Sequence, residues 1–101
     1  VDSYHLWWDP QLATQIARAG HRIASYQVCD WTLPLPADAL LGRGHVGDGC
    51  IDFTALTAMV TAAGYTGWIE VEIFNQEIWD TPGDQTLRTM IERHHTHVET
   101  P

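Results

Sequence analysis

Three polar side chains with oxygen donors stand in separate strand-like segments of the chain: Asp2, Gln27 and Glu72. Two carboxylates and one side-chain amide form a hard donor set that suits Mg²⁺ or Mn²⁺. Glu72 lies inside an apolar run, where a carboxylate needs a partner to offset its lost hydration. The set predicts a divalent-metal site if the segments converge. Taken singly, Asp2 is better explained as a solvated terminal residue, and Gln27 as a hydrogen-bonded core amide.

The segments that must position these groups read as a strand followed by a helix, repeated along the chain. Residues 1–8 are rich in β-branched and aromatic side chains and predict a buried strand, followed by a helix from Pro10 to Gly20. Residues 22–29 predict the second strand. A long loop from Asp30 to about Cys50 then leads to a helix that is capped by Asp52 and ends at Gly64.

The third unit begins with residues 68–74, the most strand-like stretch of the sequence. Its alternation places Glu70 and Glu72 on one face and apolar side chains on the other. Strands of an open doubly wound sheet are usually apolar on both faces, so two carboxylates on one face favour the interior of a (β/α)8 barrel near its catalytic end. A last helix follows, and we expect the polar tail after Arg93 to fray.

Strand-helix repetition predicts an α/β fold with a parallel sheet and right-handed crossovers. A complete barrel takes roughly 250 residues, and this chain has 101. We therefore expect one domain over residues 1–101 that is a partial barrel, completed by further chain or by another copy.

Four segments, in order, resemble the sugar phosphate isomerases/epimerases, a family of xylose isomerase-like TIM barrels. Residues 2–5 read Asp-Ser-Tyr-His, similar to the family's Asp-x-x-His, and residues 27–30 read Gln-Val-Cys-Asp, similar to its seventh-strand segment. Residues 43–52 resemble the Arg-x-x-x-Gly-x-Gly-x-Ile-Asp loop, and residues 64–72 the Gly-Tyr-x-Gly approach to the last strand's glutamate. The resemblance implies that the chain is the C-terminal three βα units of a (β/α)8 TIM barrel.

The same resemblance implies roles for individual residues. Asp2, Gln27 and Glu72 would bind one divalent metal, Mn²⁺ or Mg²⁺ with Co²⁺ or Zn²⁺ as alternatives, together with a fifth-strand Glu that this chain lacks. Gln27 stands where the epimerases usually carry His. Hydroxypyruvate isomerase-like members carry Gln there, in a His-x-Gln pattern whose His is replaced by Ser25 in this chain. Glu72 would also act as acid and base, and His5 would contact the substrate.

Two further residues are candidates for substrate binding. Arg43 is one of only five basic residues and lies in a Gly-rich loop, where it can bind an anionic or enediolate oxygen. Trp8 can stack on a sugar ring, although packing at the rim is the plainer interpretation. Cys29 is expected to be an inert residue of the barrel interior.

The implied activity is isomerisation or epimerisation of a sugar or sugar phosphate through proton abstraction and an enediolate. An inosose-type dehydratase begins with the same proton abstraction and is an alternative. A non-catalytic fragment is another, since the 101-residue chain by itself lacks one ligand and is expected to be inactive.

The composition of the chain disfavours several classes of binding partner. A formal charge of −8 disfavours nucleic acid, including the DNA-repair endonucleases of related fold, and disfavours anionic membranes. Two cysteines are too few for a disulfide scaffold and fit a cytoplasmic protein. The expected partners are a small sugar or keto-sugar substrate and the rest of the barrel.

Overall fold

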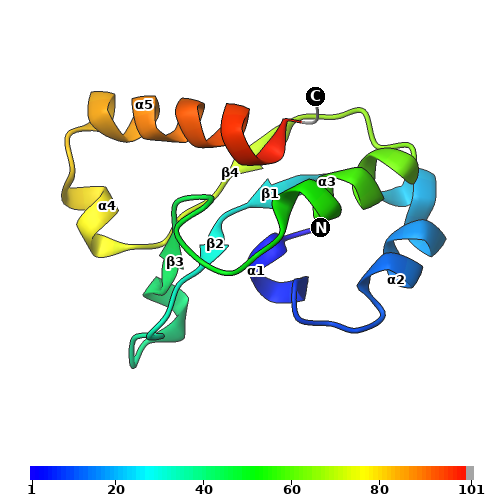
Figure 1. Cartoon of the computed structure of the whole chain (residues 1–101), viewed down its shortest axis with the longest axis horizontal. Coiled ribbons are helices and arrows are strands. Elements are labelled where there is room, and N and C mark those ends of the chain that lie inside the picture. Colours follow the sequence, from blue (N-terminus) through cyan, green and yellow to red (C-terminus); the bar gives the residue numbers. More distant parts are fainter. Residues whose placement is uncertain (100–101) are drawn as a thin grey trace.

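A short parallel sheet lies at the centre of the computed structural model, which describes residues 1–99. Strand β1 (Tyr26–Val28) pairs with β4 (Ile69–Val71), and Gln27 lies opposite Glu70. Asp2 extends the sheet on the other side of β1 through one parallel bridge to Gln27. Three segments far apart in sequence therefore run side by side in one direction (Figure 1).

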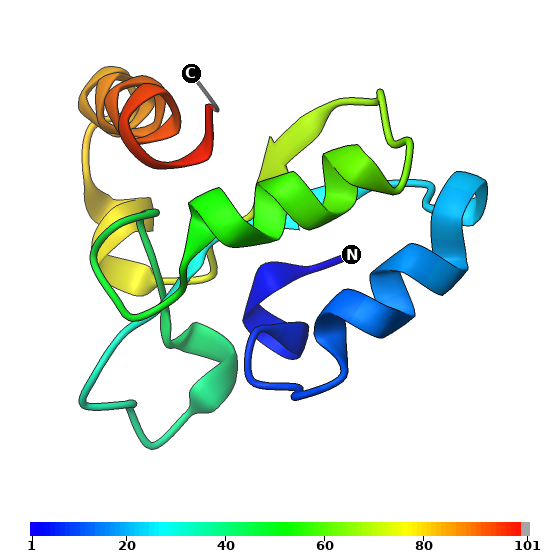
Figure 2. The same ribbon diagram turned by 45° about the vertical axis from the view of Figure 1, so that its right-hand side comes forward.

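Helices make the crossovers between these parallel segments. The chain passes from Asp2 to β1 through α1 (Ser3–Leu6), α2 (Leu12–Ala19) and the 3-10 turn η1 (Gly20–Arg22). It reaches β4 through α3 (Phe53–Ala62), which packs beside α2 (Figure 2). The α/β class predicted from the sequence is confirmed, since parallel strands alternate with helices.

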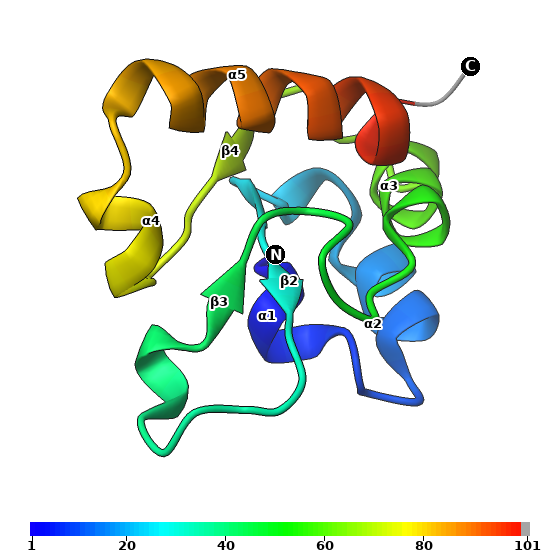
Figure 3. The same ribbon diagram turned by 60° about the vertical axis from the view of Figure 1, so that its left-hand side comes forward.

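The last helices follow β4. Helix α4 (Gln76–Asp80) is short and leads to α5 (Gly83–Arg93), which continues into the π-helical turn η3 (His94–Val98). In Figure 3, α5 runs along the top of the molecule, above β4 and the end of α3. Within residues 1–99, no helix is long and apolar enough to cross a membrane.

The larger hydrophobic cluster within residues 1–99 joins several of these elements, and a smaller one contains Tyr4, Cys29 and Ile73. The larger cluster is the core, and its buried members come from α2, β1, α3, the loop before α3 and η3: Ile16, Tyr26, Val28, Val46, Phe53, Leu56, Val60 and Val98. The sequence positions the core helix well, because Asp52 Oδ1 accepts a hydrogen bond from the Ala55 amide at 2.9 Å and caps α3. Gly64 follows the helix with a φ of 99°, a conformation that L side chains rarely adopt.

A second, antiparallel pair of strands lies at the end of β1. Strand β2 (Asp30–Trp31) pairs with β3 (Arg43–Gly44), so that Trp31 is opposite Arg43 and Asp30 is opposite Gly44. The segment between them contains the 3-10 turn η2 (Ala39–Leu41) and projects from the molecule (Figure 3). The predicted unstructured loop from Asp30 to about Cys50 is therefore wrong over these strands.

The predicted strand over residues 1–8 is also wrong. Only Asp2 forms a bridge, because its Oδ1 accepts a hydrogen bond from the Tyr4 amide at 2.9 Å and starts helix α1. Ser3 and Tyr4 are buried in this helix, so the aromatic pattern reflects a packed helix. The other predicted strands are shortened to Tyr26–Val28 and Ile69–Val71, and α2 begins at Leu12.

The expected fraying after Arg93 is wrong for residues 94–99. Val98 is 1% exposed and belongs to the core, and its burial anchors the η3 turn. The sequence signal was hidden because a single apolar residue among histidines shows no periodicity.

Candidate functional site

A single buried guanidinium gathers most of the residues expected at the site. Arg43, which is 2% exposed, places its Nη1 at 3.0 Å from Asp2 Oδ2 and at 3.7 Å from Glu72 Oε2. Its Nη2 lies 3.2 Å from His5 Nε2. The cluster of Asp2, His5, Arg43 and Glu72 therefore joins the end of the first parallel segment, helix α1, strand β3 and the segment after β4.

Two aromatic rings hold the Arg43 guanidinium from both sides. Its Cζ lies 4.8 Å from the ring centroid of Tyr4 and 4.8 Å from that of Phe74. The backbone of the same residue is fixed by Asn75, whose Nδ2 donates to the Arg43 carbonyl at 2.9 Å. Burial alone would lower the pKa of Arg43, but the hydrogen bond to Asp2 and the neighbouring Cys29 raise it, and the net shift is upward. Arg43 is thus a fixed, permanently charged donor.

One donor of Arg43 is unused. Its Nε is buried, and within residues 1–99 it has no hydrogen-bond partner. An unpaired donor on a buried cation is costly unless a partner arrives.

Cys29 lies next to the cluster of Asp2, His5, Arg43 and Glu72, but its thiol is unreactive. Its Sγ accepts a hydrogen bond from Arg43 Nη1 at 3.4 Å, and the residue is fully buried. Burial raises the pKa of the thiol to about 11 in spite of the nearby guanidinium. The thiol is therefore protonated at neutral pH and is no nucleophile, as the sequence indicated.

Gln27 points to a different neighbour. Its Nε2 donates to Glu70 Oε2 at 3.4 Å, across the paired strands β1 and β4. This contact leaves the Gln27 carbonyl oxygen without a protein donor within the described residues. Asp2 lies beside Gln27 through the backbone bridge, and Gln27 N donates to Val1 O at 2.8 Å.

The donor chemistry of Asp2, Gln27 and Glu72 fits a hard divalent cation, because all three offer oxygen. The set is incomplete, since no three His, Cys, Asp or Glu side chains within residues 1–99 are gathered to hold a metal. Both oxygens of Asp2 are also engaged, Oδ1 by the Tyr4 amide and Oδ2 by Arg43. A cation at Asp2 would therefore compete with the guanidinium for the same carboxylate.

Trp8 lies apart from this cluster. It follows α1 and is 62% exposed, and no ring contact or hydrogen bond joins it to the cluster within residues 1–99. Its role in sugar stacking stays a prediction. Tyr4 packs instead against Trp31, with ring centroids 4.8 Å apart.

Sequence reasoning missed three residues of the site's surroundings. Tyr4 and Phe74 enclose Arg43, and Asp30 is a fully buried carboxylate next to it in the fold. A signal was present for two of them, because Tyr4 lies inside the Asp-x-x-His motif and Asp30 ends the segment 27–30. Phe74 carried no signal beyond its place at the end of a strand.

Parallel strands joined by helices, with polar groups at one end of the sheet, are typical of TIM barrels and of other α/β folds. A family model described as "Xylose isomerase-like TIM barrel" matches residues 1–94, so the chain belongs to this family.

Comparison with solved structures gives a close match in fold. The crystal structure of protein SMc04130 from Sinorhizobium meliloti 1021 is 44% identical, with a TM-score of 0.91. The match covers 98% of this chain and 37% of that one, so the present chain spans well under half the length of its structural relative. No curated protein was found to match.

Proposed function

We propose that the protein containing this chain is a divalent-metal-dependent sugar or sugar-phosphate isomerase or epimerase. The reaction would proceed by proton abstraction next to a carbonyl and through an enediolate. The observation that carries the proposal is the convergence of Asp2, His5 and Glu72 on the buried Arg43. Membership in the xylose isomerase-like family supports a sugar substrate.

On this proposal Asp2, Gln27 and Glu72 would hold the cation, with Mn²⁺ or Mg²⁺ preferred for an all-oxygen set and Co²⁺ or Zn²⁺ as alternatives. When bound, the cation supplies Lewis acidity that polarises the substrate carbonyl. The remaining ligands would come from substrate, water and the part of the barrel outside this chain.

The side chains of this chain would handle the proton and the charge. The carboxylate of Glu72 is 35% exposed and can reach a bound molecule, so it is assigned to move the proton. Arg43 has an unused Nε donor, and His5 lies 3.2 Å from its Nη2. These two side chains would donate to the oxygen on which negative charge develops.

The chain would form the last three βα units of a barrel over residues 1–101. A groove of about 360 Å³ beside β4 is lined by apolar side chains and two histidines: Ile69, Val71, Leu87, Met90, Ile91, His94 and His95. Apolar side chains of this kind on an open sheet edge favour a covering element. We assign that cover to the remaining units of the barrel, with a second copy of the chain as the alternative. Both cysteines are free, which supports a cytoplasmic location.

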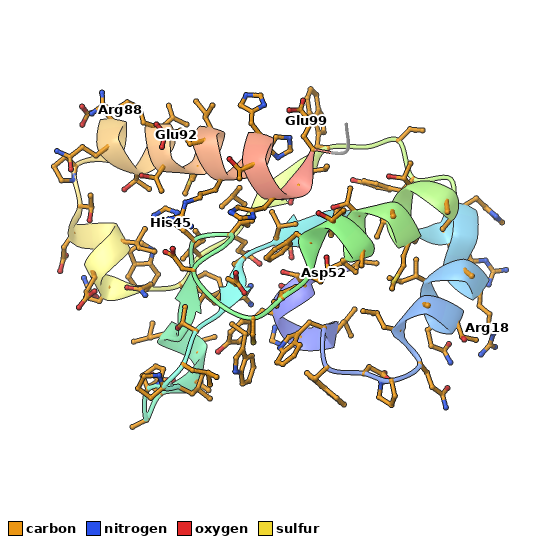
Figure 4. All side chains as sticks on the ribbon, in the orientation of Figure 1. Arg18, His45, Asp52, Arg88, Glu92 and Glu99 are labelled. Carbon is orange, nitrogen blue, oxygen red and sulfur yellow. The ribbon has the colours of Figure 1, made fainter. Side chains whose placement is uncertain are left out.

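Deuterium exchange tests the proposal directly. The complete protein, loaded with Mn²⁺, is incubated with a panel of aldoses, ketoses and their phosphates in D₂O, and NMR follows deuterium entering the carbon next to the carbonyl. We expect exchange with at least one sugar, and loss of nearly all of it in Glu72→Gln while the protein stays folded. Glu92→Gln, on the outer side of α5 (Figure 4), is the matched control and should keep it.

The products separate the alternatives. Exchange with a rearranged sugar supports the isomerase, whereas exchange with loss of water supports the inosose-type dehydratase. Most activity surviving in Glu72→Gln would remove Glu72 from the mechanism. No exchange with any sugar would support a non-catalytic role.

A further inference from the structure

Asp30 is a buried carboxylate that is satisfied entirely by the backbone. It is fully buried, and within residues 1–99 no Arg or His side chain pairs with it. Its Oδ2 accepts from the amides of Gly47 and Gly49, both at 2.9 Å. Its Oδ1 accepts from the Trp31 amide at 2.9 Å and the Ile51 amide at 3.1 Å. A buried charge is tolerated only when it is compensated in this way.

The donors to Asp30 come from the glycine-containing loop that follows β3. Gly47, Gly49 and Ile51 lie 17 to 21 residues further along the chain. A Cβ at Gly49 would collide with the Trp31 carbonyl and with Asp30 itself, so the close approach requires glycine there. The loop is therefore built around the Asp30 carboxylate.

The same residue also fixes the strand that carries Arg43. In the β2–β3 pair, Asp30 is opposite Gly44, and its neighbour Trp31 is opposite Arg43. The backbone of Asp30 thus holds β3 directly, while its side chain holds the loop that leaves β3. Asp30 therefore holds the chain on the C-terminal side of Arg43, at Gly44 and in the loop that follows.

A second anchor on this loop is weaker. Arg93 of α5 donates to the Val46 carbonyl at 3.0 Å and pairs with Asp48 at 2.7 Å. The side chains of this ion pair are 32% and 44% exposed, so water screens them. The buried hydrogen bonds of Asp30 therefore fix the position of the loop more strongly than the exposed contacts of Arg93 do.

We propose that Asp30 is a positioning residue that fixes Arg43 in the site, through the loop 47–51 and the β2–β3 pair. This inference rests on the proposed function, which assigns Arg43 to the binding of substrate oxygen. Within residues 1–99, Asp30 forms no hydrogen bond or ion pair with the side chains of Asp2, His5, Arg43 or Glu72, so it would act through the position of Arg43. In Asp30→Asn the amide nitrogen would face backbone donors, so two of the four bonds would be lost and the loop would move.

The exchange rate of the Arg43 Nε proton with water measures whether the guanidinium keeps its position, and this measurement does not depend on enzyme activity. It is buried and unpartnered, so its exchange with water is slow only while the guanidinium stays between its two rings. In the complete protein with ¹⁵N-labelled arginine, we expect Asp30→Asn to speed this exchange about tenfold or more, as the loss of a hydrogen bond to a charged group would do. Asp52→Asn removes an exposed carboxylate that caps α3, and it should leave the exchange unchanged.

Binding of a planar dianion tests whether the position of Arg43 matters for binding an anionic ligand. Oxalate, in the presence of Mn²⁺, is the probe, measured by calorimetry in single and double variants. We expect Asp30→Asn to weaken oxalate about tenfold when Arg43 is present and less than twofold in an Arg43→Gln background. A merely structural role would weaken binding equally in both backgrounds.

The outcomes are distinguishable. Unchanged Nε exchange in a folded Asp30→Asn protein overturns the inference, and so does equal weakening of oxalate in both backgrounds. If wild type fails to bind oxalate but the exchange result holds, Asp30 positions Arg43 and the proposed function is wrong. If Asp30→Asn does not fold, Gly49→Ala, in the exposed loop, disturbs the same anchor and is expected to give the same two results.

Discussion

The Asp2 carboxylate and the Arg43 guanidinium form a salt bridge of 3.0 Å although they are 41 residues apart, and their side chains are 16% and 3% exposed. Water screens such a pair little, so the attraction between the two charges is stronger than at an exposed site. The pair places a fixed positive charge on the carboxylate that the proposed function assigns to a metal cation.

The first prediction concerns this competition in the complete protein. Removing the charge in Arg43→Gln should tighten Mn²⁺ binding in the absence of sugar by about tenfold or more, because two cations a few ångströms apart repel strongly at a partly buried site. Calorimetry or electron paramagnetic resonance measures the affinity. Arg88→Gln, on the exposed side of α5 (Figure 4), is the control and should not change it. Weaker Mn²⁺ binding in folded Arg43→Gln would contradict the competition.

The second prediction separates backbone strain from a steric clash. Gly47 and Gly64 both have positive φ, 92° and 99°, so Ala at either costs about 1–2 kcal/mol. A Cβ at Gly64 meets nothing, whereas a Cβ at Gly47 would collide with the His97 ring. Urea unfolding should therefore show a larger loss for Gly47→Ala than for Gly64→Ala. Adding His97→Ala should remove the difference, and equal losses without it would refute the packing of η3 on this loop.

The third prediction concerns a buried hydroxyl pair. The Tyr26 hydroxyl lies 3.0 Å from Thr57 Oγ1, and both residues are buried. Burial raises the pKa of Tyr26 to about 12, so the phenol stays neutral and hydrogen-bonded. Tyr26→Phe should lower the free energy of unfolding by about 1–3 kcal/mol, because the Thr57 hydroxyl is left unpaired. The double variant with Thr57→Val should lose less than the sum of the singles, and additive losses would argue against the pair.

The fourth prediction is a pH dependence of stability. Burial lowers the pKa of His45 from 6.5; Asp48 acts in the opposite sense, and Arg93 also lowers it. The unfolded chain therefore binds a proton more readily than the folded one. The stability that comes from neutral His45 is complete above about pH 6.5 and is lost as the pH falls through the lower pKa of the folded state.

Urea unfolding at several pH values checks this prediction. His45→Gln should lose less stability between pH 7.5 and 5 than wild type. His45 lies near α5 (Figure 4) and is partly buried, whereas His21 is exposed, so His21→Gln serves as the control with wild-type behaviour. The same slope in all three proteins would show that His45 is not the group responsible.

Local sequence signals foretold the elements whose residues interact with near neighbours. The Asp52 cap and Gly64 delimit α3, and alternation along β4 correctly separates Glu70 from the core-packed Ile69 and Val71. These features are local because caps and side-chain faces depend on neighbouring backbone geometry. The motifs also selected His5 and Arg43, which the fold brings together.

Tertiary structure alone decided how those residues are used. Nothing local in the sequence indicates that Arg43 is enclosed by Tyr4 and Phe74, or that Gln27 turns to Glu70. Such contacts join residues tens of positions apart. They depend on the strand register and on which of several possible partners each polar group binds in the folded chain. The first predicted strand was wrong for a related reason. The Asp2 side chain caps helix α1 with Oδ1 and pairs with Arg43 through Oδ2, so both carboxylate oxygens have partners when a helix follows Asp2.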